Sequence, residues 1–418
     1  MTRILAALVL SCFAATALAD NWPAWRGPTG QGHCAEKGIP TTWSDTENVK
    51  WKVPLENPGN STPVIWGDKI FVTQANKGGS QRSLLCFARE DGRVLWQKDV
   101  AYTEKERNWN ETWYANASPA LDGERAIVSF GSAGMYCYDY AGNELWKRTD
   151  LGTWEHAFGN GASPVLYGEL VILWCGPNEN KGRNFLLAVN KKTGETVWEK
   201  DQPYGSWSTP LITKVKDQDQ LILGFSKDVK GQPDDKTGYL YGFDPKTGME
   251  LWKCQGLNSY CYTSPLYDDG VAVGMAGFGG SALAVKLGGM GDITADRLWL
   301  HPKNTQRVGS GVVTKGHVYI VDENGIPHCY DLQTGEEKWK FDKRPSGAST
   351  WGSMVHVDDR LLVLMRNGDT VAFAAKPEYE LLTVNKLGGA ETNSSLAISD
   401  GQIFIRTFKH LWCIEEKK

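Results

Sequence analysis

The sequence predicts an all-β fold, namely an eight-bladed β-propeller made of four-stranded antiparallel blades. Three observations predict it: a tryptophan motif that repeats along the chain, alternation of apolar and polar residues, and a glycine turn before nearly every repeated tryptophan. The tryptophans lie 40 to 54 residues apart, an interval that fits four short strands with their turns. They are Trp51, Trp96, Trp146, Trp198, Trp252, Trp299 and Trp339.

One repeat, residues 61–100, shows the expected strand order. The segment "STPVIWGD" is typical of an inner strand that ends in a turn, and "KIFVTQ" is expected to run back beside it. The third strand is "SLLCFARE", and Asp91-Gly92 turns the chain into the fourth strand, "RVLWQKDV". Glycine supplies the positive φ that a tight hairpin turn requires, which explains the TG, DG or AG before the tryptophan strands.

Eight inner strands are predicted, but the last repeat lacks a fourth strand because the chain ends after "HLWCIEE". We expect residues 48–55, "NVKWKVPL", to supply that strand and so to leave the ring without a free edge. Residues 48–418 then form one domain, since no blade could bury both of its faces alone. The predicted inner strands begin at Ser61, Ala117, Ala162, Ser208, Thr263, Gly309, Trp351 and Ser394.

The repeated tryptophans are predicted to be structural docking residues, each on an outer strand and packed against the neighbouring blade with a glycine turn as support. One other repeat position holds Cys86, Cys137, Cys329 or Cys413, and alanine or glycine elsewhere, which predicts a tight core position. Cys254 and Cys261 are near enough in sequence to bridge in an oxidising compartment, but the sequence leaves their pairing open.

The first 19 residues have the features of a secretory signal peptide: one arginine, an apolar run and Ala17-Leu18-Ala19 before Asp20. An N-terminal extension, residues 20–47, would follow. The alternative is a lipidation box that ends at Cys12, which Leu10 and the short apolar run disfavour. No later segment has the ~20 apolar residues of a membrane span, so a periplasmic or secreted protein is expected.

The composition is that of a folded protein, with 41% hydrophobic and 22% charged residues. The formal net charge is -4, and no basic tail or stripe favours a nucleic-acid partner. We therefore expect no nucleic-acid partner. We also expect a monomer that contacts an envelope protein or a glycan.

The segments "AVNKKTGETVW" and "GFDPKTGMELW" resemble the tryptophan-docking motif of the pyrroloquinoline-quinone (PQQ) repeat family. This family includes the propellers of quinoprotein dehydrogenases and of the outer-membrane assembly lipoprotein BamB. The leader "NWPAWRGPTGQG", residues 21–32, also resembles the opening of exported propellers of planctomycete-type bacteria. The resemblance implies a propeller fold along the whole mature chain.

For the enzymes of this family, the resemblance implies a quinone above two adjacent cysteines, with calcium and a catalytic aspartate beside it. The sequence has no Cys-Cys pair, and no Asp or Glu could be matched to the calcium ligands or to the base. We therefore predict no catalytic residue, no metal site and no cofactor, and PQQ with calcium is the disfavoured alternative. Repeat similarity by itself concerns how blades pack and does not imply that a quinone binds.

The long loops that lead into the inner strands are expected to surround the mouth of the central channel and to carry a ligand site. An aromatic funnel with mixed charges would suit a flat ring, a sugar or an extended peptide. The alternative is that these aromatic residues plug the channel and pack blades together. The candidate ligand-binding residues are Arg107, Trp109, Trp113, Trp154, His156, Trp207, Tyr260, Arg307 and Trp351.

Two functions are compatible with these features. The favoured hypothesis is an exported, non-catalytic propeller that binds or scaffolds a protein or glycan partner in the cell envelope. The alternative is a PQQ-dependent alcohol or sugar dehydrogenase with a divergent site.

Overall fold

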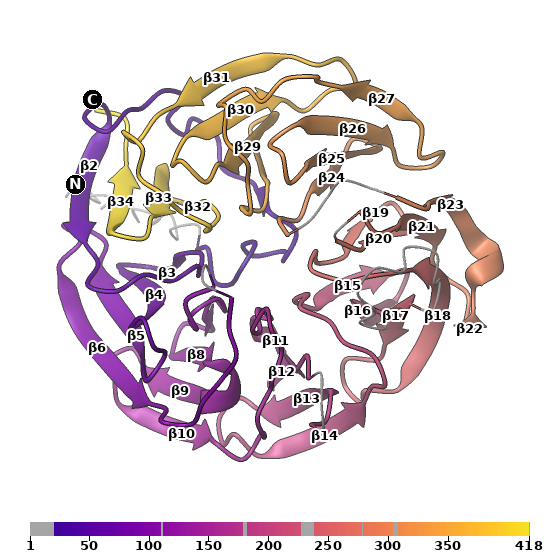
Figure 1. Ribbon diagram of the computed structural model, residues 1–418, viewed down its shortest axis with the longest axis horizontal. Coiled ribbons are helices and arrows are strands. Elements are labelled where there is room, and N and C mark those ends of the chain that lie inside the picture. Colours follow the sequence, from indigo (N-terminus) through magenta and orange to yellow (C-terminus); the bar gives the residue numbers. More distant parts are fainter. Residues whose placement is uncertain are drawn as a thin grey trace, which may run out of the picture.

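The computed structural model describes residues 21–109, 112–178, 182–226, 238–277, 279–303 and 308–417. The strands of these residues form eight small sheets arranged around a ring (Figure 1). We call the sheets blades 1 to 8 in chain order, so that blade 1 begins with β3 and blade 8 begins with β32. The predicted all-β, eight-bladed propeller is confirmed.

The first four blades follow one another along the chain. Blade 1 contains β3 (Val64–Trp66), β4 (Lys69–Ala75), β5 (Gln81–Ala88) and β6 (Val94–Ala101). Blade 2 contains β7 (Ala120–Leu121), β8 (Arg125–Ser129), β9 (Met135–Asp139) and β10 (Glu144–Arg148). Blade 3 contains β11 (Val165–Tyr167), β12 (Leu170–Cys175), β13 (Phe185–Asn190) and β14 (Thr196–Asp201). Blade 4 contains β15 (Leu211–Val215), β16 (Gln218–Phe225), β17 (Gly238–Phe243) and β18 (Glu250–Leu257), with β22 (Gly291–Asp292) added at its outer edge.

The other four blades complete the ring. Blade 5 contains β19 (Leu266–Asp268), β20 (Val271–Met275), β21 (Ala282–Lys286) and β23 (Arg297–His301). Blade 6 contains β24 (Val312–Thr314), β25 (His317–Val321), β26 (Pro327–Asp331) and β27 (Glu337–Lys340). Blade 7 contains β28 (Val355–Val357), β29 (Arg360–Leu364), β30 (Thr370–Ala374) and β31 (Leu381–Asn385), with β1 (His33–Cys34) added at its inner edge. Blade 8 contains β32 (Ala397–Ser399), β33 (Gln402–Arg406), β34 (His410–Ile414) and β2 (Val49–Pro54).

The N-terminal strand closes the ring as predicted. β2 pairs antiparallel with β34, so that Trp51 lies opposite Cys413 and Val53 lies opposite Leu411. Figure 1 shows β2 beside β34 at the outer edge of blade 8. Because β2 is the outer strand of this blade, the ring has no half-built blade to expose unpaired backbone groups.

Burial explains why each strand occupies its place in a blade. In blade 3, the middle strands β12 and β13 are buried on both faces, whereas the outer strand β14 alternates and buries Trp198. The core therefore lies between blades. One apolar cluster, for example, joins Ile172 and Trp174 of blade 3 to Leu221 and Phe225 of blade 4. Among the described residues, helix is limited to η1 (Gly131–Ala133) and η2 (Thr294–Asp296), and no helix is long and apolar enough to cross a membrane.

Six of the seven repeated tryptophans dock onto the next blade. In each case the indole Nε1 donates a hydrogen bond of 2.9 to 3.2 Å to a main-chain carbonyl of that blade. Trp198 of blade 3, for instance, donates to the carbonyl of Pro245, and its ring lies over Gly248. Gly248 has a φ of 70°, and a Cβ there would come within 2.5 Å of the Trp198 ring. The turn glycine is therefore needed both for its backbone conformation and for the space it leaves.

Trp252 departs from this prediction. Its Nε1 donates to Gln220 Oε1 in its own blade at 2.7 Å, and its ring folds over Gly242 of β17. The reason lies in blade 5, where the segment between β21 and β23 carries β22 in place of a short glycine turn. β22 pairs in parallel with β18 at Trp252 and covers the place where a docking turn would lie.

The predicted small core position lies opposite the tryptophan on the neighbouring strand. Cys86 pairs with Trp96, Cys137 with Trp146, and Cys413 with Trp51, and these three cysteines are fully buried. A small side chain leaves room for the large ring beside it. All eight cysteines of the described residues are free, so Cys254 and Cys261 do not form the bridge that the sequence left open.

Residues 21–47 lie across the ring and are not a detached extension (Figure 1). Trp22 forms an antiparallel bridge with Ile65, and the carbonyl of Pro23 accepts a hydrogen bond from the Leu121 amide. The segment then reaches blade 7, where β1 pairs with β28. These contacts lie where the first strand of a blade turns into the second, on the face opposite the loops that lead into the inner strands.

Candidate functional site

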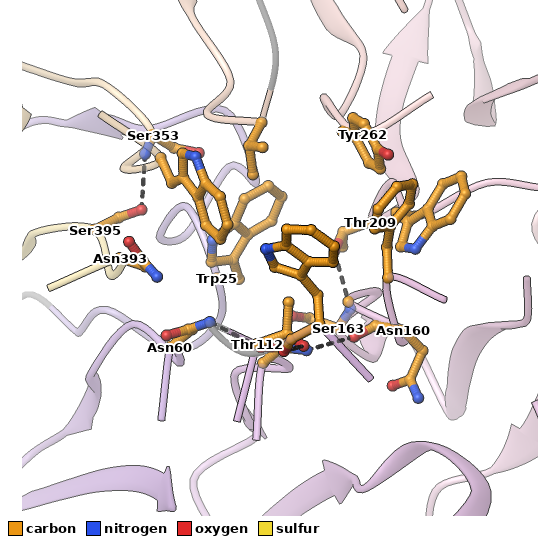
Figure 2. A pocket seen from close by; sticks show the side chains of 17 residues that line it. Trp25, Asn60, Thr112, Asn160, Ser163, Thr209, Tyr262, Ser353, Asn393 and Ser395 are labelled. Atoms are coloured by element: carbon orange, nitrogen blue, oxygen red, sulfur yellow. Dashed lines mark hydrogen bonds between the residues drawn. The ribbon is translucent and has the colours of Figure 1, made fainter. Parts of the chain in front are cut away.

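A cavity of about 160 Å³ lies at the centre of the ring, where the long loops lead into the inner strands (Figure 2). We call this cavity the central cup. Every blade contributes to its wall, because the inner strands lie nearest the ring axis. The described lining residues are Trp25, Asn60, Trp109, Thr112, Asn116, Phe158, Asn160, Gly161, Ser163, Trp207, Thr209, Tyr262, Val308, Trp351, Ser353, Asn393 and Ser395.

Two rings of equivalent residues build the cup, one residue from each blade. The hydroxyl ring comprises Thr62, Ser118, Ser163, Thr209, Ser264, Ser310, Ser353 and Ser395. The rim ring lies two residues earlier in each blade and comprises Asn60, Asn116, Gly161, Trp207, Tyr262, Val308, Trp351 and Asn393. All eight rim residues line the cup, together with four residues of the hydroxyl ring.

The hydroxyl ring links the blades to one another. The main-chain amide of Thr62 donates to the Ser118 hydroxyl, and the same bond recurs from each blade to the next as far as Ser395. These seven bonds measure 2.9 to 3.0 Å. Sequence reasoning missed this ring, although a Ser or Thr stands at the same position of every predicted inner strand.

The rim ring has two chemically different halves. Blades 8, 1 and 2 present Asn393, Asn60 and Asn116, and Asn160 lies beside the glycine of blade 3. Blades 4 to 7 present aromatic or apolar side chains instead: Trp207, Tyr262, Val308 and Trp351. Figure 2 shows Asn393 and Asn60 on one side of the cup and Tyr262 on the other, with Trp25 between them. At the rim ring a ligand therefore meets amides on one side and mainly rings on the other, and Trp109 and Phe158 add aromatic surface from the loops into blades 2 and 3.

Hydrogen bonds orient the amide side. Asn60 Nδ2 donates to Asn116 Oδ1 at 2.9 Å, and Asn116 Nδ2 donates to the Asn160 carbonyl at 2.7 Å. Asn160 Nδ2 donates in turn to Glu106 Oε1 at 3.2 Å. Glu106 is buried and forms an ion pair with the buried Arg82, although burial still raises the pKa of its carboxyl group. This buried pair anchors the far end of the amide chain.

The aromatic side is a packed cluster around Trp207. The Trp207 ring lies 4.5 Å from His156, 4.8 Å from Tyr262 and 5.5 Å from Tyr260 between centroids. His156 is buried, and its Nδ1 accepts the Phe158 amide at 3.0 Å. That bond requires an unprotonated Nδ1 and so leaves the imidazole no lone pair there for a base reaction. His156 therefore supports the wall.

The floor of the cup comes from the N-terminal segment. Trp25 reaches the cavity from residues 21–47, and the neighbouring Arg26 lies 5.8 Å from the Trp25 ring. Arg26 is buried and its guanidinium donates to the carbonyls of Gln31 and Gly311, which ties the segment to blade 6. Burial lowers the pKa of Arg26 to about 9.

The structure brings together part of the predicted funnel. Trp109, Trp207 and Trp351 line the cup, whereas His156 and Tyr260 stand behind its wall. The remaining candidates do not line it: Trp113 packs against Phe408 at 5.7 Å, Trp154 is buried and donates to the Leu151 carbonyl, and Arg107 is an exposed loop residue. Arg307 lies outside the described residues.

The lining residues that sequence reasoning missed include Trp25 and the asparagines. No local signal marks Trp25, because its place depends on where residues 21–47 lie across the ring. The asparagines had a usable signal, since Asn60, Asn116 and Asn393 each stand two residues before the hydroxyl position.

The residues that line the central cup would match the chemistry of PQQ only in part. PQQ is a planar quinone that carries carboxylates, and the aromatic side of the cup could contact its ring system. The described lining, however, has no cationic side chain for those carboxylates, and the sequence has no adjacent cysteine pair. Within the described ranges, no group of three His, Cys, Asp or Glu side chains could hold a metal ion.

Comparison with known proteins places the chain among related propellers. A family model described as outer membrane protein assembly factor BamB matches residues 40–149 and 81–341, which together span more than half of the chain. The BamB structure from Moraxella catarrhalis superposes with a TM-score of 0.60 at 13% identity and covers 88% of this chain and 96% of its own. The quinohemoprotein alcohol dehydrogenase from Comamonas testosteroni superposes with a TM-score of 0.68 at 12% identity, over 96% of this chain and 81% of its own.

One curated relative shares a short segment of sequence. The quinoprotein ethanol dehydrogenase of Pseudomonas putida is 40% identical over 74 residues, which are 16% of this chain and 11% of that enzyme. The match therefore spans about a tenth of the relative's length. The two structural similarities, at 12–13% identity, concern the fold alone.

Proposed function

Because the chain belongs to the family described as outer membrane protein assembly factor BamB, we propose that it is a non-catalytic binding protein of the cell envelope. The central cup would be the centre of its binding face. The observation that carries this proposal is the chemistry of the described lining, which consists of amides, hydroxyls and aromatic rings on a rigid ring of blades. Such groups orient and hold a ligand, whereas acid–base or nucleophilic catalysis needs groups that titrate or react.

The proposal includes export. Residues 1–19 would be removed as a signal peptide, residues 20–47 would form the extension that carries the cup floor, and residues 48–418 would form the propeller. The family description refers to the outer membrane, which supports a place in the periplasm or outside the cell. The partner would be an envelope protein or a glycan, contacted by a monomer.

Site-specific cross-linking tests the binding face. A photoreactive phenylalanine at position 109, where Trp109 is 51% exposed at the cup, should label a defined partner in envelope extract. The matched control carries the same group in place of Met249. This residue directly precedes the outer strand of blade 4, and its side chain is 58% exposed. Equal labelling at both positions, or none at position 109, would contradict the proposal.

A second candidate is a PQQ-dependent alcohol or sugar dehydrogenase. The sequence match to the quinoprotein ethanol dehydrogenase and the aromatic side of the cup support it. Titration of the purified protein with PQQ and calcium would show a bound-quinone absorbance band, and an alcohol and aldose panel would then reduce a dye. If neither the absorbance band nor dye reduction is observed, this candidate function is ruled out.

A further inference from the structure

We propose that the central cup binds one uncharged pyranose ring, as the end of a glycan or of a free oligosaccharide. The inference rests on the proposed function, because it assigns a ligand class to the same cup. Four features of the described residues carry it: the size of the cavity, the unused hydroxyl donors at its base, the oriented amides on one side and the aromatic surfaces on the other.

The size of the cup restricts what can enter. Pockets that enclose drug-sized ligands measure roughly 300–1,000 Å³. The cup, with about 160 Å³, has room for one ring-sized group. Its walls come from eight blades tied together by the hydroxyl ring, so the cavity is held in shape before a ligand arrives.

The base of the cup presents hydroxyl donors without acceptors. Ser163, Thr209, Ser353 and Ser395 line the cavity, and each oxygen accepts the main-chain amide of the preceding blade. A hydroxyl that accepts such a bond still has its own proton to donate. In the described part of the chain, these four hydroxyls donate to no protein group. A ligand rich in oxygen atoms would supply the acceptors they lack.

The amide side can pair with groups that both donate and accept. Asn116 uses one N–H on the Asn160 carbonyl and one lone pair on Asn60, and therefore keeps one donor and one acceptor. Asn160 points its side-chain amide away from the cavity, against Gly131 and Glu106. It therefore supports Asn116 through its main-chain carbonyl and does not meet the ligand itself. A sugar hydroxyl donates one hydrogen bond and accepts others, so it satisfies both kinds of group at once. The chain that ends at Glu106 holds these amides in place.

Two indoles of the lining suit the C–H face of a pyranose, Trp109 of the loop into blade 2 and Trp351 of the aromatic side. Trp109 stands 51% exposed at the edge of the cup and packs edge-on against Phe158 at 5.8 Å. Trp351 is backed by Arg366, whose guanidinium lies 4.9 Å from the ring centroid and donates to Asn393. Both indoles are thus supported from behind and can take the apolar face of a sugar ring.

The charge of the lining favours a neutral ring over an acidic one. The described lining residues carry no formal charge, and an anion taken from water into such a site would lack a partner. Arg307 precedes the lining residue Val308 but lies outside the described residues, so the experiment compares neutral and acidic sugars directly.

Calorimetric titration of the mature chain with maltotetraose, cellotetraose and tetra-N-acetylchitotetraose tests the inference, with tetragalacturonate as the acidic probe. We expect saturable binding of at least one neutral tetrasaccharide with a Kd below about 1 mM. Trp109→Ala should weaken that binding by about tenfold or more, and Asn116→Ala by about fivefold. Met249→Ala should bind as the parent does.

The inference is overturned if no neutral tetrasaccharide binds at about 10 mM, if tetragalacturonate binds more tightly than the neutral sugars, or if Trp109→Ala leaves the affinity unchanged. The free oligosaccharide and the same glycan on an envelope polymer are then compared. Equal affinities would identify the pyranose ring itself as the ligand. A protein partner cross-linked at position 109, without sugar binding, would remove this inference and retain the proposed binding function.

Discussion

The outer and inner rings of the propeller use the same repeat in opposite ways. At the outer ring the residue itself recurs, and six tryptophans make the same hydrogen bond to the next blade. At the rim ring the position recurs but the residue changes, from asparagine in blade 1 to tryptophan in blade 4. Recurrent identity serves packing between equivalent blades, whereas varied identity at one position can fit a ligand that lacks eightfold symmetry.

The junction between blades 4 and 5 sharpens this comparison. Trp252 keeps its place in the sequence but bonds within its own blade, because β22 occupies the outer edge. The outer ring therefore tolerates one different junction while the hydroxyl ring continues through it, since the Thr209 amide still donates to Ser264 at 3.0 Å. Continuity of the ring depends on the inner hydroxyls as well as on the tryptophans.

The largest effect should come from removal of the closing strand. A mature chain that begins after Leu55 lacks β2 and the Trp51 contact to blade 1, and it leaves β34 as an open edge. We expect a loss comparable with the whole free energy of unfolding of a domain, roughly 5–15 kcal/mol, and no cooperative thermal transition. Differential scanning calorimetry of the shortened chain would measure whether this transition is lost.

A chain that begins at Asn48 is the matched control. It keeps β2 and loses the cup floor, so it should still melt cooperatively. If the shorter chain retained full thermal resistance, closure by β2 would not stabilise the ring.

The next largest effects concern single tryptophans of the outer ring. Trp198→Ala and Trp252→Ala should each lower the free energy of unfolding by about 3–5 kcal/mol, because both indoles are buried. Gln220→Ala removes the acceptor of Trp252 and should have little effect on the Trp198 contact. Urea unfolding measures all three variants. An unchanged free energy of unfolding in either tryptophan variant would contradict the packing role.

A smaller effect should follow from acid at the anchor of the N-terminal segment. His33 Nδ1 lies 3.2 Å from His356 Nδ1, and burial lowers the pKa of His33 to about 4 and also lowers the pKa of His356. Above about pH 6.5, both histidines are neutral in the folded chain and in the unfolded chain. As the pH falls from about 6.5 to 4, the unfolded chain binds protons that the folded chain does not. Stability should therefore fall by about 3 kcal/mol for His33.

Urea unfolding at pH 7 and pH 4.5 measures this loss. His33→Asn should reduce the pH dependence, while His317→Asn in blade 6 serves as the control. A parent protein that is equally stable at both pH values would show that the His33 and His356 pair does not oppose protonation.

The smallest effect on stability is expected at the rim. Trp109→Ala should change the free energy of unfolding by no more than about 0.5 kcal/mol, because half of the side chain is exposed and its ring contact to Phe158 lies at the edge of the cup. Thermal melting beside Trp198→Ala gives the direct comparison. A loss as large as that of Trp198→Ala would mean that the rim serves packing, as the alternative in the sequence analysis supposed.

Much of the architecture could be predicted from local pattern. Glycine turns, strand alternation and the spacing of Trp96, Trp146 and Trp198 recur in most repeats, so they predict blades and their number. The unpaired last repeat also predicted closure by residues 48–55, where the structure has β2. The exception at Trp252 could not be predicted, because it depends on β22 from a different blade.

The candidate site was predicted less completely. Trp109, Trp207 and Trp351 were found because aromatic residues in long loops at a channel mouth are conspicuous. Trp113 and Trp154 have the same loop setting and yet turn away, toward Phe408 and the blade core. Side-chain direction in an irregular loop depends on backbone torsions and neighbours that no sequence period specifies.

By itself, the sequence determined the repeating blade, the number of blades and the strand that closes the ring, because these follow from local patterns and contacts that recur in most repeats. The tertiary structure alone decided where Trp25 lies, how the asparagines are oriented and which aromatic residues share one cavity. Those features join residues from opposite ends of the chain and from all eight blades. Their positions are therefore set by ring closure and by long-range hydrogen bonds.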